Sequence, residues 1–212
     1  MRVEIQDASK SFGDVLVFDG FSCTIEPGQV TALVGPSGSG KSTLLAAMAG
    51  FQRLDSGRVI YEHADGTTEP PSPQHVAWVP QGANALGART AIDNVMLSAL
   101  AAGAGLETAR RAARDQLEKV GMTDRMDTLA KYLSGGELQR VGFARALAAK
   151  KPLIFADEPT SSLDAANTEH VAELLHTLRE SATIVVATHD PRLVESARHV
   201  IQVRRGHGSR PA

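Results

Sequence analysis

The chain has 212 residues, of which 42% are hydrophobic and 22% are charged, a balance typical of one globular domain or of two closely joined lobes. The formal net charge of -2 offers no basic field of the kind that marks nucleic-acid-binding proteins, so we expect no nucleic-acid partner. The single cysteine, Cys23, excludes an intrachain disulfide and fits a reducing cytosol, and we expect it to be a small buried core residue.

The sequence contains no membrane-spanning pattern, because no apolar run approaches the roughly 20 residues needed to cross a bilayer. Residues 1–5 alternate like a short strand and do not resemble a signal peptide. We therefore expect any membrane role to depend on a separate protein.

The first third of the chain is predicted to consist mainly of strands. Alternating or continuous apolar runs indicate strands at residues 3–5, 15–18, 21–25, 30–34, 58–61 and 75–79. Pro27-Gly28 marks a turn before the fourth run, and a polar, proline-rich loop is expected at 65–74.

A glycine-rich segment follows the strand at 30–34 and opens a helix predicted at 42–49. Glycines let backbone N–H groups curl around phosphate oxygens, Lys41 can reach the β- and γ-phosphates, and the Ser42 hydroxyl can bind Mg²⁺. A plain glycine-rich turn would not require this strand, loop and helix context, so we predict an ATP-binding phosphate loop. Its residues are Gly35, Pro36, Ser37, Gly38, Ser39, Gly40, Lys41, Ser42 and the following Thr43.

The middle of the chain is predicted to be helical. A capping box at 90–93 precedes a helix at 95–100, and a second helical pattern covers 107–120. Ser134, Gly135 and Gly136 precede a third helix at 137–149. These three residues resemble either an ordinary N-cap or a helix N-terminus with exposed N–H groups that binds an anion.

The last third alternates strands with helices. Buried strands are expected at 153–156 and 183–187 and a final strand at 200–203, with helices at 165–179 and 191–197 and a disordered tail from 204. This alternation predicts an α/β fold with a parallel sheet.

Two adjacent carboxylates, Asp157 and Glu158, follow the strand at 153–156. Open α/β sheets bind ligands at the carboxyl ends of their strands, so these acids are expected beside the phosphate loop. Asp157 is predicted to hold Mg²⁺ through water and Glu158 to polarise the attacking water. Alone, the pair could also be two surface acids before a turn, but its combination with the phosphate loop favours the metal and water roles.

Residues 133–140, Leu-Ser-Gly-Gly-Glu-Leu-Gln-Arg, resemble the signature motif of ABC-type ATPases, and they lie between the phosphate loop and the acidic strand in that family's order. The resemblance implies a phosphate-loop NTPase core with a parallel sheet, an N-terminal antiparallel β subdomain and an inserted helical subdomain. Within a single domain covering 1–212, the core and β subdomain would occupy about 1–80 and 150–205, the helical part about 82–149, and a disordered tail 206–212.

The same resemblance assigns roles to residues that would otherwise attract no attention. Phe12 would stack on adenine, and Val17 would pack on the same base or simply belong to the core. Gln81 would sense Mg²⁺ and the γ-phosphate, and His189 would contact that phosphate. Asp164, at the end of the loop 161–164, would lie where the chain crosses to an opposite subunit.

The family resemblance also implies an ATP-dependent dimer. ATP would bind between two subunits, with the phosphate loop of one facing Ser134, Gly135 and Gly136 of the other. The chain carries each motif once, so it would need a second copy or a paralogous ATPase. ATP would close the dimer because it touches both subunits only in the closed state.

Within the family, residues 84–95 and the signature resemble the macrolide-efflux and lipoprotein-release branch. That resemblance implies a subunit held at the cytoplasmic face of the membrane by a separate permease, driving export or mechanotransmission. Amino-acid importer ATPases are the alternative. Cell-division relatives that mainly recruit a membrane partner are a second, and soluble ABC ATPases of DNA repair or translation lack support because no long insertion or second cassette is present.

Overall fold

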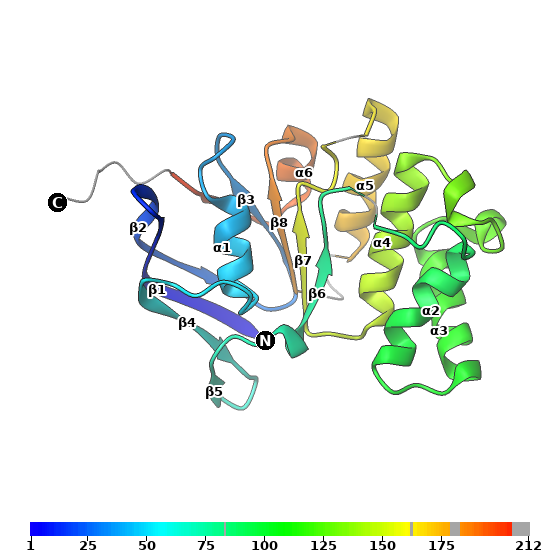
Figure 1. Ribbon diagram of the computed structural model, residues 1–212, viewed down its shortest axis with the longest axis horizontal. Coiled ribbons are helices and arrows are strands. Elements are labelled where there is room, and N and C mark those ends of the chain that lie inside the picture. The colour runs from blue at the N-terminus through cyan, green and yellow to red at the C-terminus, as the bar shows by residue number, and fades with distance from the viewer. Residues whose placement is uncertain (83, 162, 179–182, 205–212) are drawn as a thin grey trace.

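The computed structural model describes residues 1–82, 84–161, 163–178 and 183–204, which form two sheets and a group of helices (Figure 1). The first sheet is antiparallel, with the strand order β2-β1-β4-β5. Its strands are β1 (Arg2–Phe12), β2 (Val15–Ile25), β4 (Ser56–Glu62) and β5 (Thr68–Glu69). This sheet is the predicted N-terminal antiparallel β subdomain.

The second sheet is parallel and has the order β6-β7-β8-β3-β9. Its strands are β3 (Val30–Val34), β6 (Val76–Val79), β7 (Leu153–Asp157), β8 (Thr183–Thr188) and β9 (His199–Gln202). The three central strands are almost fully buried because helices or the other sheet cover both faces, which explains their continuous apolar sequences.

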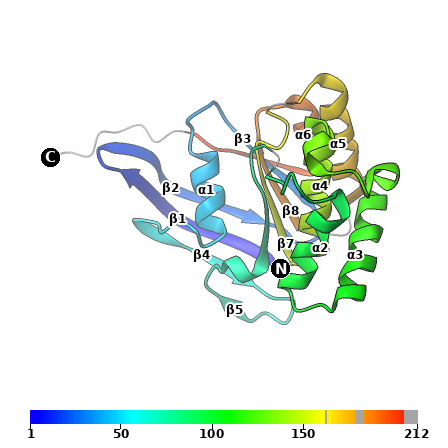
Figure 2. The same cartoon turned by 45° about the vertical axis from the view of Figure 1, so that its right-hand side comes forward.

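Helices fill the space around the parallel sheet (Figures 1 and 2). Helix α1 lies between the two sheets, α2 to α4 form a group beyond β6, and α5 and α6 cover the face of the parallel sheet opposite α1. The bounds are α1 (Lys41–Met48), α2 (Ala91–Ala101), α3 (Leu106–Lys119), α4 (Gly135–Ala148), α5 (Ala165–Leu178) and α6 (Pro191–Ser196), with short 3₁₀ turns at Pro73–His75, Thr123–Arg125 and Ala130–Tyr132.

Two apolar cores hold the layers together. The first joins α1 to both sheets, with Leu44 of α1, Phe18 of β2 and Phe155 of β7 among its buried side chains. The second joins the opposite face of the parallel sheet to α2 through α5, including Ile154 and Phe143. Alternate residues of β7 therefore enter different cores, as the period of a strand requires.

The predicted fold class is confirmed, with four local corrections. The first strand, predicted at 3–5, runs from Arg2 to Phe12 because it pairs with β2 along its length. Residues 15–25 form one strand and not two, because β1 continues to pair across Gly20 (φ 61°) through shifts in register. The predicted loop 65–74 contains the two-residue strand β5. Cys23 is only half-buried, at the edge of the first core, where burial raises the pKa of its thiol to about 12.

The boundaries predicted for the lobes stay a prediction, and the predicted tail 206–212 lies outside the described residues. Among the residues that the model describes, no helix is long and apolar enough to span a membrane.

Helix α2 begins with the predicted capping box, because Thr90 Oγ1 accepts the Asp93 N–H (3.2 Å) and Asp93 Oδ2 accepts the Thr90 N–H (3.4 Å). The fully buried Asn94 then ties the preceding loop to the helix. Its Oδ1 accepts the Leu86 N–H (2.7 Å), and its Nδ2 donates to the carbonyls of Leu86, Arg89 and Thr90. This one side chain thus satisfies backbone groups along the whole loop.

We expect Asn94→Ala to lower the free energy of unfolding by about 2 to 4 kcal/mol, because it removes these hydrogen bonds and leaves a cavity. Chemical denaturation measures the change. Asn84→Ala, which alters an exposed side chain in the same loop, is the control and should stay within about 0.5 kcal/mol of the parent. Equal effects of the two variants would show that Asn94 does not hold the loop.

Candidate nucleotide-binding site

The phosphate loop connects β3 to α1 and approaches neighbouring side chains and backbone so closely that two of its positions require glycine. Gly40 has a φ of 93°, and a Cβ there would lie 2.4 Å from Val17 Cγ1. A Cβ at Gly35 would lie 2.3 Å from the Val203 carbonyl oxygen. A side chain at either position would displace the loop, so these glycines keep its N–H groups at the start of α1 free to face an anion.

Lys41, the first residue of α1, is held inside the loop. Its Nζ donates to the carbonyls of Gly35 (2.9 Å) and Pro36 (3.3 Å) and lies 3.2 Å from Glu158 Oε1. The lysine side chain is only 6% exposed and the glutamate side chain 14%. A nearly buried cation is therefore paired with a nearly buried carboxylate, which offsets the desolvation of both.

Ser42 and Asp157 form a second contact between the loop and β7. The Ser42 hydroxyl donates to Asp157 Oδ1 at 2.8 Å. Burial raises the pKa of Asp157, and the hydrogen bond from Ser42 opposes that shift. A hydroxyl oxygen and a carboxylate beside a phosphate loop are ligands that Mg²⁺ prefers, so the residues present fit this metal.

Glu158 occupies an unusual backbone position for a residue with a side chain, with a φ of 43°. Its N–H donates to the Ala187 carbonyl (2.8 Å) at the end of the neighbouring strand β8, which holds the turn in place. Its Oε2 lies 2.9 Å from His189 Nδ1. Because β7 and β8 are adjacent and parallel, their carboxyl ends bring this acid and this histidine together.

Gln81 follows β6, and its Nε2 donates to Ser161 Oγ at 3.2 Å. Ser161 lies in the loop after Glu158 and was not among the individually predicted site residues. Its hydroxyl carries no sequence signal of its own, since only the tertiary structure brings it to Gln81.

The phosphate loop and the ends of β6, β7 and β8 surround an open cleft of about 590 Å³, which is large enough for a nucleotide phosphate chain. The lining residues are Val17, Pro36, Ser37, Gly38, Gly40, Lys41, Ser42, Thr43, Gln81, Glu158, Ser161 and His189. All of them except Ser161 were predicted from the sequence, so the fold brings eleven predicted residues together around this cleft.

Several predicted residues lie elsewhere. The Phe12 ring is 51% exposed outside the cleft lining, with Lys10 Nζ 5.2 Å from its centroid. Ser39 is buried, and its hydroxyl has no hydrogen-bond partner among the described residues. Gly35 and Asp157 support the cleft from behind through Lys41 and Ser42.

The signature residues and Asp164 form a second cluster that does not line the cleft. Ser134 caps α4 reciprocally with Glu137, and its N–H donates to Glu137 Oε2 (2.8 Å), which lowers the pKa of that carboxyl. Gly136 lies flat against Asn167, since a Cβ there would be 1.9 Å from Asn167 Oδ1. Asn167 Nδ2 in turn donates to Asp164 Oδ1 (2.9 Å).

Comparison with known proteins identifies the family. The model of the ABC transporter family matches residues 18–161, more than half of the chain. The chain is 35% identical to the macrolide export ATP-binding/permease protein MacB of Syntrophobacter fumaroxidans, across 96% of this chain and 30% of that protein. It is 36% identical to the methionine import ATP-binding protein MetN of Rhizobium johnstonii, across 91% of this chain and 55% of that protein.

The chain thus spans about a third to about half of the length of these two relatives. Among solved structures, it resembles the dimeric bacterial ABC transporter cassette MJ0796 with a TM-score of 0.80 and 28% identity, over 95% of this chain and 94% of that one. A second structure of that cassette, a post-hydrolysis dimer bound to ADP and Pi, gives a TM-score of 0.79 at 29% identity. The chain belongs to the ABC transporter family and has the fold of its ATP-binding cassettes.

Proposed function

We propose that this chain is the ATP-binding and ATP-hydrolysing subunit of an ABC transporter, and that it works as a dimer enclosing MgATP. The observation that carries the proposal is the convergence of Lys41, Ser42, Glu158 and His189, with Asp157 behind them, at the carboxyl ends of three parallel strands. An anion-binding loop, a metal-binding pair and a carboxylate base are the parts that phosphoryl transfer to water needs.

Each side chain has a role that its position supports. Lys41 would neutralise the β- and γ-phosphates, and Ser42 and Asp157 would hold Mg²⁺ together with Gln81. The ion would neutralise charge that develops on the phosphates. Glu158 would polarise the attacking water, and His189, bonded to its Oε2, would orient that carboxylate and contact the γ-phosphate. Val17, which lines the cleft, would pack on the base with Phe12.

The dimer is supported by where the signature lies. Ser134 and Gly135 form an exposed helix start and Gly136 is buried behind them; none of the three lines the subunit's own cleft, so we infer that they do not serve its nucleotide. A helix N-terminus attracts anions. A second copy or a paralogue would supply its signature to this cleft, an arrangement favoured by the dimeric cassette of similar structure.

Export or mechanotransmission is the transport mode that we propose, through a separate permease that holds the subunit at the cytoplasmic face of the membrane. The macrolide exporter relatives support this branch, since two of them are 35% and 36% identical across 96% of the chain. An importer ATPase is the second candidate, because the methionine importer relative is equally similar. Cell-division recruitment would instead predict hydrolysis that is dispensable.

We expect Glu158→Gln to lower kcat for MgATP hydrolysis by about a hundredfold or more, because the amide cannot accept a proton from water. Nucleotide binding should persist, and closed dimer should accumulate in MgATP, as measured by phosphate release and by size-exclusion chromatography. Glu107→Gln, an exposed acid on α3, is the control. Hydrolysis at the parent rate would remove Glu158 from the mechanism.

We expect Lys41→Ala to weaken ATP binding by roughly 10-fold to 100-fold, because a charge-assisted contact to phosphate is lost. Calorimetric titration with ATP measures the affinity, and the exposed Lys119→Ala is the control. Unchanged affinity together with unchanged hydrolysis would contradict the phosphate-loop assignment.

We expect Ser134→Arg to fold and to bind ATP at its own phosphate loop, yet to form no ATP-dependent dimer, because its side chain fills the space that the partner's γ-phosphate needs. Mixing it with Lys41→Ala creates dimers that contain one site with both lesions and one intact site. Partial recovery of hydrolysis on mixing would support a shared site. A rate per subunit that does not depend on protein concentration would refute it.

A further inference from the structure

Helix α4 supports both ends of the loop that carries Gln81. At the near end, Val79 closes β6 against Gly142, whose Cβ position lies 3.9 Å from Val79 Cγ1. At the far end, Arg145 Nη1 donates to the Asn84 carbonyl at 2.5 Å. Gly142 and Arg145 are three residues apart and so lie on the same face of the helix. Val79 and Asn84, which lie on either side of Gln81, therefore both contact one helix.

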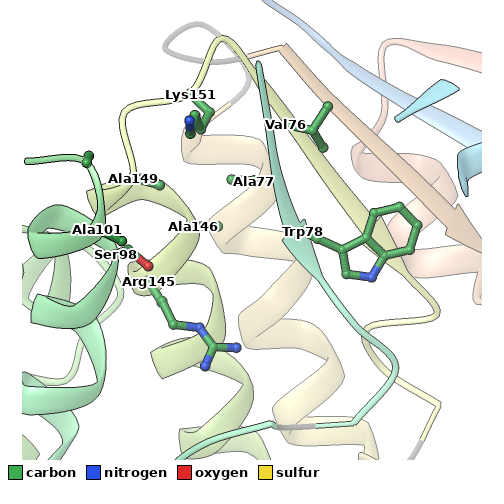
Figure 3. Close-up of a pocket in the computed structure, with 10 residues that line it drawn as sticks. Val76, Ala77, Trp78, Ser98, Ala101, Arg145, Ala146, Ala149 and Lys151 are labelled. Carbon is green, nitrogen blue, oxygen red and sulfur yellow. The ribbon is translucent and has the colours of Figure 1, made fainter. Parts of the chain in front are cut away.

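Arg145 lines a cavity of about 240 Å³ between β6, α2 and α4 (Figure 3). In this view its guanidinium extends away from Ala146 and Ala149 of the same helix. Burial lowers the pKa of Arg145, and no carboxylate of the described residues lies within ion-pairing distance of it. The Asn84 carbonyl is thus the acceptor that holds this partly buried cation in place.

Gln81 itself has little local restraint. Its side chain is exposed, and among the described residues it makes one side-chain hydrogen bond, of 3.2 Å, to Ser161. The next residue, Gly82, has a φ of 78°, and nothing lies within 4 Å of the place where its Cβ would be. The position of Gln81 in the cleft therefore depends on the two anchors at Val79 and Asn84.

The same helix begins at the signature. Ser134 and Glu137 cap its N-terminus, and buried Val141, Phe143 and Ala144 lock it into the second core. Any rotation of α4 must move the signature and the Asn84 anchor together, because a packed helix moves as a rigid body.

We propose that Arg145 is a positioning residue that keeps Gln81 in register with the signature helix. Gln81 contacts the nucleotide bound by its own subunit, whereas the signature contacts the nucleotide bound by the partner. Through Arg145, a change in the position of Gln81 at one nucleotide therefore moves the signature at the other. This inference rests on the proposed function for the role of Gln81. The hydrogen bond from Arg145 to the Asn84 carbonyl does not depend on the proposed function. The structural role of Arg145 and its effect on hydrolysis are therefore tested separately.

The first experiment uses ligand-free protein and measures hydrogen exchange in a peptide covering residues 79–92. Arg145→Met, which keeps the length of the side chain but has no donor, should accelerate exchange of the Leu86 amide by roughly tenfold, because the loop loses a charge-assisted anchor. Lys151→Met is the matched control: Lys151 lines the same cavity and donates to the Gln74 carbonyl, away from Gln81. Unchanged exchange in Arg145→Met, or equal acceleration in Lys151→Met, would overturn the proposal.

The second experiment is a double-mutant cycle on MgATP hydrolysis. Arg145→Met should lower kcat by roughly tenfold while KM changes less than twofold, and it should have no further effect in a Gln81→Ala background. Arg145→Lys, which keeps a cationic donor, should recover part of the lost kcat. It is also the variant to use if Arg145→Met fails to fold. An equal loss in the Gln81→Ala background would show that Arg145 does not act through Gln81. A parent without ATPase activity would instead refute the proposed function, and the exchange result alone would then decide whether Arg145 holds the loop.

Discussion

The ion pair between Lys41 and Glu158 is the interaction on which the site depends. It joins the first residue of α1 to the turn that follows β7, and both side chains are nearly buried. Each charge offsets the cost of burying the other, because a lone buried charge is destabilising. The pair therefore links the phosphate loop to the turn after β7, and through His189 it also reaches the end of β8.

The backbone accepts strain to maintain this arrangement. Glu158 has a positive φ, which costs free energy for a residue with a Cβ, and the hydrogen bond to Ala187 holds it there. Ser42 and Asp157 add a second connection between α1 and β7. Two adjacent acids at one strand end thus have different environments: one turns to the hydroxyl of the loop and the other to a lysine and a histidine. This division supports separate metal-binding and base roles.

The helices beyond β6 connect the segment that follows Gln81 to the surface that carries the signature. Asn94 of α2 and Arg145 of α4 both bind backbone carbonyls of the segment after Gln81. Backbone hydrogen bonds from Lys131 to Gly87 and from Ala130 to Arg89 hold the same segment. At the other end of α4, Gly136 contacts Asn167, which also holds Asp164. The parts predicted to face a partner are therefore packed on one another.

Motifs that depend on local chemistry could be predicted from the sequence. The phosphate loop, the acids at the end of β7 and the capping box at 90–93 were predictable because each needs particular residue types at fixed spacing. Continuous apolar runs likewise predicted β3, β7 and β8. The tertiary structure was needed to show that residues 15–25 form one strand, that Ser161 meets Gln81, and that Arg145 donates to the Asn84 carbonyl. Those contacts join residues distant in the chain through backbone carbonyls or unremarkable hydroxyls, and such groups leave no pattern in the sequence because every residue carries a carbonyl.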